Sequence, residues 1–308
     1  GAFAREAPDE AGIRYRARIA DIEAHEVAGD TAGAIQTALG YRSGSTDSQS
    51  AALSLRAGRL ARATGDDATA RAAFLDALNA EGSTGARGAA GELLEMGGLS
   101  RDQRLQIADV DARHGNNSRA ADGYRDWLAG SSAGDARDEV SLRLGRALFN
   151  AGQFQAAERV LDPLHSVNSV AASALLLSGR SQYRRGAETQ AFATFRELGR
   201  RYPGSSQGAE AMFLVGDLNH DELQMGDATS AYRQVATDFQ GHDRAGLSLM
   251  RLGGYQYLQE NYDAAAEFWE EYRSTYPTGE RWLQSTYWAG RAYEQQGDTA
   301  LARNRYRA

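Results

Sequence analysis

Eight alanines recur along this chain at nearly regular intervals. The intervals are 36, 50, 37, 34, 37, 37 and 37 residues. A repeat of about 34–40 residues is typical of a stacked array of helix–turn–helix units. We therefore expect each alanine to mark one unit. The eight residues are Ala34, Ala70, Ala120, Ala157, Ala191, Ala228, Ala265 and Ala302.

Each alanine has two partners at fixed positions. The residue four positions later is mostly large and apolar, and the residue twelve positions earlier is mostly small. A small residue lets the next helix approach closely, and the large residue fills the groove that opens one turn later. One helix pair cannot bury its apolar stripe alone, so neighbouring pairs stack. The later residues are Ala38, Phe74, Tyr124, Leu161, Phe195, Tyr232, Trp269 and Tyr306, and the earlier ones are Ile22, Gly58, Ala108, Gly145, Gly179, Gly216, Gly253 and Gly290.

This spacing predicts an all-α fold, a right-handed α-solenoid of about eight repeats with roughly 16–18 helices. Apolar residues follow helical spacing in residues 51–80 and 171–199, and the alternation that strands need is missing. The chain has only four prolines among 308 residues. We expect one continuous solenoid, because repeat arrays do not follow the usual relation between length and domain number.

Glycine marks most of the predicted turns. Gly297-Asp298 and Gly29-Asp30 lie between the helices of a pair, where a helix end often needs positive φ. Gly226-Asp227 comes three residues late, which predicts a shifted turn there. The 50-residue interval predicts one extra helix near residues 86–96, followed by a break at Gly97-Gly98. Residues 1–100 are therefore predicted to form degenerate repeats, and residues 101–308 regular repeats continuous with them.

The composition excludes several kinds of chemistry. No cysteine is present, so disulfides, zinc–thiolate sites and cysteine nucleophiles are ruled out. All 34 basic residues are arginine, and without lysine a Walker A loop or a Schiff base cannot form. The net charge of −7 weighs against nucleic-acid binding, and no apolar run reaches the roughly 18–20 residues of a membrane span.

Two histidine segments resemble metal sites only in part. The segment from His25 to Gly29 begins like a zinc-protease helix but lacks the second histidine. His220-Asp221-Glu222 offers metal ligands, but adjacent helical residues point apart, which favours a solvated turn. We therefore predict no catalytic residue, no metal and no cofactor.

A row of arginines is the strongest candidate for binding. The residue after the small position is arginine in four units, at Arg59, Arg146, Arg180 and Arg291. Guanidinium groups bind carboxylates, and rings stack on apolar stems, so such a row suits an extended acidic partner. Ion pairs between neighbouring helices are the alternative explanation. The predicted ligand-binding residues are Arg146, Arg180, Tyr183, Arg184, Tyr257 and Arg291.

The repeat pattern resembles the tetratricopeptide repeat from about residue 13 to residue 308. Two units end in Tyr-Pro, at Tyr202-Pro203 and Tyr276-Pro277, where proline stops a helix. The resemblance implies that the first helix of each pair faces a concave groove and that partners are proteins or peptides. The lysine–asparagine carboxylate clamp of chaperone-binding members is absent, which disfavours that specific function.

A shorter stretch resembles the end of the α-superhelical domain of soluble lytic murein transglycosylases. It runs from Tyr276-Pro277 to Asp298 and includes Tyr287-Trp288-Ala289-Gly290-Arg291. The resemblance implies a non-catalytic superhelix of a cell-wall enzyme in the periplasm or cell envelope, which orients glycan strands or protein partners. The catalytic Glu-Ser motif of that family is absent, so we expect this chain not to cleave peptidoglycan. The alternative is a stand-alone adaptor in the periplasm or cytosol, and the oligomeric state is left open.

Overall fold

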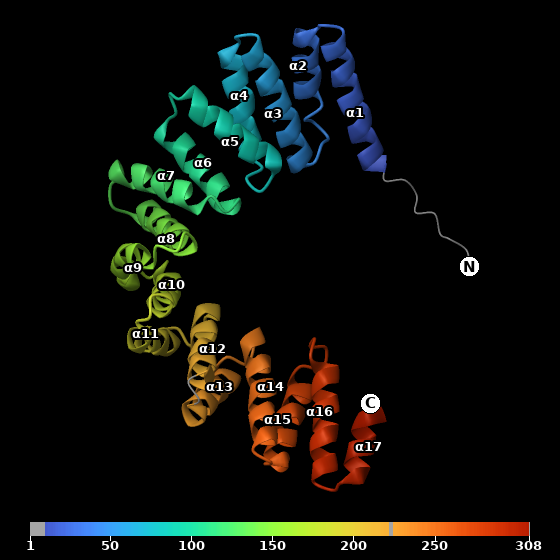
Figure 1. The fold of residues 1–308 in the computed structure, drawn as a ribbon, viewed down its shortest axis with the longest axis vertical. Helices are drawn as coiled ribbons and strands as arrows, with labels where there is room; N and C mark the ends of the chain where they lie inside the picture. The colour runs from blue at the N-terminus through green and yellow to red at the C-terminus, as the bar shows by residue number, and fades with distance from the viewer. Residues whose placement is uncertain (1–9, 222–223, 308) are drawn as a thin grey trace, which may run out of the picture. The chain divides into compact units, whose positions relative to one another are not determined.

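Seventeen α-helices and one short 3₁₀ helix make up the described part of this computed structural model, which covers residues 10–221 and 224–307. No strand occurs in those two ranges, so the all-α prediction is confirmed there (Figure 1). The first eight helices are α1(Glu10–Val27), α2(Thr31–Gly40), α3(Asp47–Ala63), α4(Asp67–Ala77), α5(Thr84–Met96), α6(Arg101–Arg113), α7(Asn117–Ala129) and α8(Asp135–Asn150). The others are α9(Phe154–Leu161), η1(Asp162–Ser166), α10(Ala171–Arg184), α11(Glu188–Arg201), α12(Ser206–Asp221), α13(Met225–Asp238), α14(Asp243–Leu258), α15(Tyr262–Thr275), α16(Trp282–Gln295) and α17(Thr299–Arg307).

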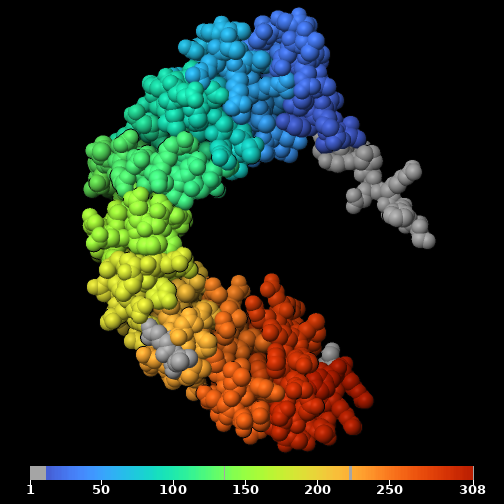
Figure 2. All heavy atoms as spheres, in the orientation of Figure 1, coloured from blue at the N-terminus to red at the C-terminus, as the bar shows by residue number. Residues whose placement is uncertain are grey.

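The helices form two compact units, residues 1–153 and 154–308. In each unit the helices pack in chain order, as the succession of colours in Figure 2 shows. The boundary between these units, after residue 153, differs from the predicted boundary between degenerate and regular repeats, which lies near residue 100. None of the described helices has both the length and the apolar character that a membrane crossing requires.

The repeat spacing produces close contacts between glycine and a ring. A Cβ at Gly58 would lie 2.4 Å from the ring of Phe74, and one at Gly179 would lie 2.4 Å from the ring of Phe195. Real Cβ atoms do not approach so closely, so only glycine allows the ring to lie there. The same contact joins Gly216 to Tyr232, Gly253 to Trp269 and Gly290 to Tyr306. The eight repeat alanines are all buried, which confirms their predicted place between helices.

Turn glycines and side-chain caps set the helix ends. The glycines at 29, 65, 115, 152, 186 and 297 all have positive φ. Asp30 and Asp66 accept hydrogen bonds from the backbone N–H groups of Gly33 and Thr69, which caps α2 and α4. In the seventh repeat this turn position is Glu260, which has φ +62°. A residue with a Cβ is strained in this conformation.

The predicted shift at Gly226-Asp227 is wrong. Helix α13 begins at Met225, three residues before Ala228, and α15 begins three residues before Ala265 in the same way. Packing of Tyr232 against Gly216 fixes this register. Gly226 therefore lies in the first helical turn, where a glycine costs little.

The additional helix in the 50-residue interval is α5(Thr84–Met96). The hydroxyl of Ser83 accepts a hydrogen bond from the backbone N–H of Ala86 at 3.0 Å, which caps the helix start. Gly97 follows Met96 with φ +66° and ends the helix. The interval is long because this helix packs on α3 and α4 before the regular pairs resume.

Candidate binding site

Two of the four arginines of the predicted row, Arg59 and Arg180, bind acids on a neighbouring helix. Arg59 Nε lies 2.7 Å from Glu92 Oε1, which joins α3 to α5. Arg180 Nη2 lies 2.9 Å from Glu210 Oε1, and Arg244 binds the other oxygen of the same carboxylate. Glu210 thus connects α10, α12 and α14. These contacts are the ion pairs that the sequence left open as the alternative, and ligand binding by Arg180 stays a prediction.

Tyr183 and Arg184 lie at the end of α10, on the surface. The side chain of Tyr183 is 37% exposed, and Arg184 is exposed as well. Among the described residues neither side chain has a hydrogen-bond or ion-pair partner. Their role in binding stays a prediction.

Arg146 lines a polar cleft of about 430 Å³ in the first unit, between α6, α7 and α8. Its side chain is exposed and has no ion-pair partner in the described ranges. Arg113 and Arg143 line the same cleft. Each of them is held by an acid, so Arg146 is the least constrained of the three.

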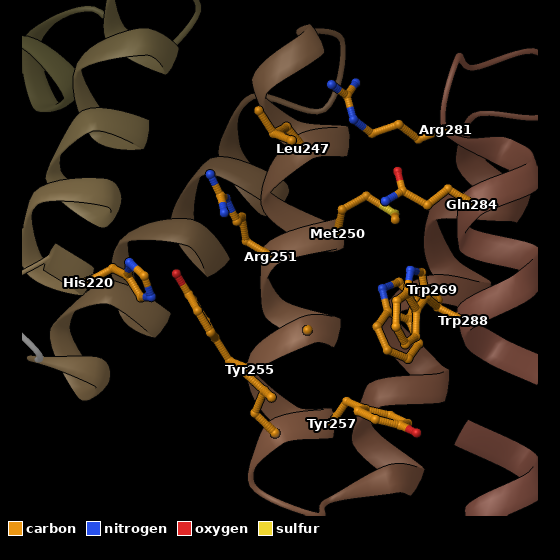
Figure 3. A pocket seen from close by; sticks show the side chains of 12 residues that line it. His220, Leu247, Met250, Arg251, Tyr255, Tyr257, Trp269, Arg281, Gln284 and Trp288 are labelled. Atoms are coloured by element: carbon orange, nitrogen blue, oxygen red, sulfur yellow. The ribbon is translucent and has the colours of Figure 1, made fainter. Parts of the chain in front are cut away.

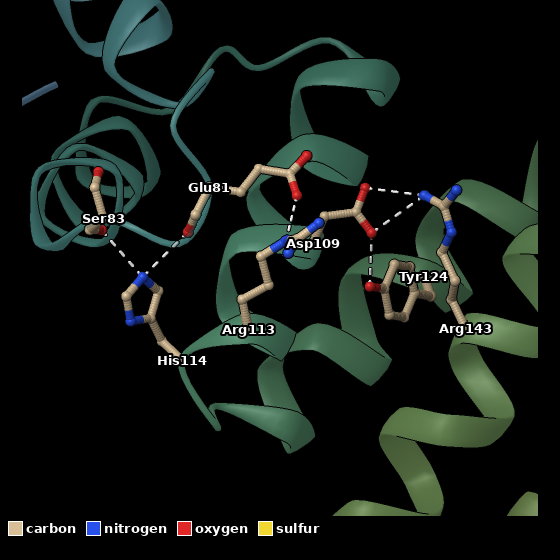
Figure 4. A network of polar contacts seen from close by, with 7 residues as sticks. All are labelled: Glu81, Ser83, Asp109, Arg113, His114, Tyr124 and Arg143. Carbon is tan, nitrogen blue, oxygen red and sulfur yellow. Dashed lines mark hydrogen bonds and ion pairs between the residues drawn. The ribbon is translucent and has the colours of Figure 1, made fainter. Parts of the chain in front are cut away.

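A network of polar contacts supports this cleft (Figure 4). Asp109 accepts a hydrogen bond from the Tyr124 hydroxyl at 2.8 Å and binds Arg143 at 3.0 Å. Burial, together with the Asp109 carboxylate, raises the pKa of the Tyr124 hydroxyl, which therefore stays a neutral donor. Glu81 holds Arg113 in an ion pair. The network braces the helices and leaves few groups free for a ligand.

A different cleft, of about 460 Å³, lies in the second unit between α12, α14 and α16 (Figure 3). One face of α14 and one face of α16 form its walls, and Trp269 reaches it from α15. Tyr257 is the predicted site residue that lies here. The lining residues are His220, Leu247, Met250, Arg251, Gly254, Tyr255, Tyr257, Leu258, Trp269, Arg281, Gln284 and Trp288.

Three rings form the floor of this aromatic cleft. The ring centroids of Tyr257, Trp269 and Trp288 lie 5.7–5.9 Å apart in each pairing. This separation is in the range of favourable aromatic contacts. Trp269 can lie against α14 only because Gly253 has no side chain. The next residue, Gly254, has open space where its Cβ would be, so the wall is hollow there.

Arg291 lies beside the aromatic floor and is thus brought together with Tyr257. The Tyr257 hydroxyl is the main cause that raises the pKa of the Arg291 guanidinium. Arg291 also binds Glu294 one turn later, at 3.0 Å. Of the six predicted site residues, these two are neighbours, whereas Arg180, Tyr183 and Arg184 lie on α10 and Arg146 lies in the other unit.

The polar groups around the aromatic cleft are mostly hydrogen-bond donors. Arg281 and Gln284 have no side-chain partner among the described residues, and Arg251 lies 3.9 Å from Asp217. The indole N–H of Trp269 is buried without an acceptor. The twelve lining residues include two arginines and no carboxylate. A ligand that brings acceptors and an apolar group therefore fits the cleft.

The two polar segments that resembled metal sites have other partners. His25 binds Asp30, and Glu26 binds Arg56. His220 stacks on Tyr255 with ring centroids 5.0 Å apart, and Glu222 lies outside the described residues. No group of three or more metal-ligating side chains occurs within residues 10–221 and 224–307.

Sequence reasoning missed most of the aromatic cleft. Trp269 was assigned only to helix packing, Trp288 was named only within the segment that resembles lytic transglycosylases, and Arg251, Arg281 and Gln284 were not singled out. A usable signal existed, because residues 281, 284 and 288 are spaced by three and four and so share one face of a helix.

Comparison with known proteins identifies the repeat. Residues 142–206 match the family model of the tetratricopeptide repeat. No curated protein sequence matches the chain. Among solved structures, the apo form of RapI is 13% identical, with a TM-score of 0.50 over 97% of this chain and 86% of RapI. A tetratricopeptide repeat protein from Parabacteroides merdae ATCC 43184 is 15% identical, with a TM-score of 0.42 over 95% of this chain and 98% of its own.

At such identities a likeness concerns the fold alone. The matched repeat also coincides with helices α8 to α11 and with the glycine–ring contact of Gly179 and Phe195. Residues 142–206 therefore match a tetratricopeptide repeat, and the described helices have the fold of an array of such helix pairs.

Proposed function

We propose that this protein is a helical-repeat scaffold that binds other proteins, and that the aromatic cleft of the second unit is its binding site. The observation that carries the proposal is the floor of Tyr257, Trp269 and Trp288, which opens to a cleft instead of being covered by a further helix. Tryptophan, tyrosine and arginine dominate the binding energy of protein interfaces. The cleft concentrates all three residue types.

The rim of the cleft supports the same proposal. Leu258 ends α14 and is 80% exposed, although it is an apolar residue next to an aromatic floor. Single exposed leucines need no explanation, but an apolar residue that continues a cleft enlarges the surface that a partner can cover. Met250 adds a flexible side chain that adapts to different ligands.

A second candidate is the non-catalytic superhelix of a peptidoglycan lytic transglycosylase in the cell envelope. The segment Tyr276 to Asp298 favours it by resemblance, and it supplies Arg281, Gln284 and Trp288 to the cleft. Under this candidate the cleft would hold a glycan strand or the acidic stem peptide of peptidoglycan. We rank it second because helix-pair arrays commonly present extended surfaces to protein partners.

The test uses a display library of random ten-residue peptides selected on the purified chain. We expect enriched peptides to bind the wild type and to bind Trp288→Leu at least about tenfold more weakly, because an aromatic anchor contributes about 2 kcal/mol or more. Leucine keeps an apolar contact in the half-buried position, and circular dichroism confirms that the variant is folded.

Leu283→Ala is the matched control, because Leu283 is 74% exposed on the same helix and does not line the cleft. It should bind the peptides like the wild type. Failure to enrich any peptide, or equal binding by Trp288→Leu, contradicts the proposal. Binding of purified muropeptides that is lost in Trp288→Leu, with no peptide enriched, establishes the second candidate.

A further inference from the structure

We infer that the ligand of the aromatic cleft is an extended peptide segment in which an apolar residue and an acidic residue lie about three positions apart. The inference rests on the proposed function, which it makes more specific. It is carried by Arg281, which has no acidic partner among the described residues, by the spacing between an arginine and an apolar residue on both walls, and by the continuation of the cleft past Arg281.

The charge of the cleft calls for an anion. Arg281 has no acidic partner among the described residues. Arg251 is 3.9 Å from Asp217, beyond hydrogen-bond distance, and Asp217 already accepts the hydroxyl of Tyr232. The chain as a whole carries a net charge of −7, whereas the residues that line this cleft include two arginines and no carboxylate. A guanidinium binds a carboxylate through two parallel hydrogen bonds, which no neutral group matches.

The spacing is the same on both walls of the cleft. On α14, Arg251 precedes Leu258 by seven residues, and on the α16 side Arg281 precedes Trp288 by seven residues. Seven helical residues, as from Arg251 to Leu258 in α14, rise about 10 Å; Arg281 is the residue just before α16. An extended chain covers this distance in about three residues. Figure 3 shows both arginines toward one end of the cleft and Tyr257, Trp269 and Trp288 toward the other.

The cleft continues past Arg281, which favours a chain over a small molecule. A second cleft of about 550 Å³ adjoins the first and shares Leu247 and Arg281 with it. Its lining is polar and includes Asp243 and Glu280. A peptide that places its acidic residue at Arg281 can therefore run on into the second cleft.

The experiment uses two fluorescein-labelled peptides, Gly-Ser-Gly-Phe-Ser-Ser-Glu-Gly-Ser-Gly and the same sequence with Gln in place of Glu. Fluorescence polarisation at low salt should show the Glu peptide binding about five- to tenfold more tightly to the wild type. In the double variant Arg251→Gln, Arg281→Gln, the two peptides should bind equally. Arg303→Gln is the matched control, since Arg303 is an exposed arginine of the same unit outside the cleft, and should keep the difference.

Equal binding of both peptides by the wild type overturns the inference, as does a preference for Glu that survives in the double variant. Absence of binding by either peptide also overturns it. In these cases the library selection with Trp288→Leu still decides separately whether the cleft binds peptides. Muropeptide binding that depends on Arg281 while neither peptide binds would assign the anion to peptidoglycan instead.

Discussion

Gly253 and Gly254 are neighbours in α14 but should respond in opposite ways to replacement by alanine. Each glycine lies inside the helix, and alanine alone stabilises such a position by about 1 kcal/mol. At Gly254 no heavy atom lies within 4 Å of the place where a Cβ would stand. At Gly253 that Cβ would lie 2.5 Å from Trp269 Nε1 and 2.6 Å from Trp269 Cε2.

The difference follows from these distances. Trp269 has little room to move, because its ring is buried and packs against Trp288 and Tyr257. Overpacking a site of this kind costs about 1–3 kcal/mol. We therefore expect the free energy of unfolding of Gly254→Ala to be about 1 kcal/mol higher than that of the wild type. The free energy of unfolding of Gly253→Ala should be about 1–3 kcal/mol lower than that of Gly254→Ala.

Urea unfolding followed by circular dichroism measures the comparison. A repeat array does not have to unfold in one step, so the two variants are compared with each other in the same helix. A double-mutant cycle with Trp269→Leu adds a direct check, because the effect of Gly253→Ala must shrink when the ring is absent. Equal midpoints for the two alanine variants, or an unchanged effect in the Trp269→Leu background, would refute the reasoning.

Three further predictions concern the scaffold. Glu260→Gly should raise the free energy of unfolding by roughly 0.5–1 kcal/mol, since Glu260 has φ +62° where other repeats have glycine; a lower urea midpoint would contradict it. Ala265→Leu should lower the free energy by about 1–3 kcal/mol, because Ala265 is fully buried, and an unchanged melting temperature would exclude this packing. The hydrogen bond from Arg56 lowers the pKa of the Glu26 carboxyl below its ordinary 4.5. The ion pair therefore stabilises the folded state above pH 4.5, and this contribution is lost as the pH falls through the lowered pKa. The stability difference between wild type and Glu26→Gln should therefore be present at pH 7 and vanish in acid, and a difference independent of pH would rule the pair out.

The helix pairs could be predicted from the sequence because their determinants are local. Glycine and a large residue sixteen positions later define one contact between two consecutive helices, and Gly179 with Phe195 shows it. The turn between such helices is short, so spacing alone fixes which residues meet. The error at Gly226 arose from reading a Gly-Asp pair as a turn, whereas core packing of Tyr232 decides the register.

The aromatic cleft could not be predicted in the same way. It depends on how one helix pair is rotated relative to the next, and residues in different repeats determine that rotation together. Glu210 illustrates the difficulty, because it holds Arg180 thirty residues before it and Arg244 thirty-four residues after it. Only the structure shows that Arg180 has an acidic partner, whereas Arg281 has none among the described residues.

Gly254→Ala also connects the stability of the scaffold with its proposed binding role. The added methyl group would project into open space that lines the cleft, beside the floor of Tyr257, Trp269 and Trp288. An extra methyl in an apolar pocket changes affinity by about tenfold or more when the ligand fills it. The variant should thus be more stable and bind the library-selected peptides roughly tenfold more weakly, as fluorescence polarisation would measure. Affinity equal to that of the wild type would mean that peptides do not reach the wall at Gly254, and the glycine there would then serve no purpose in binding.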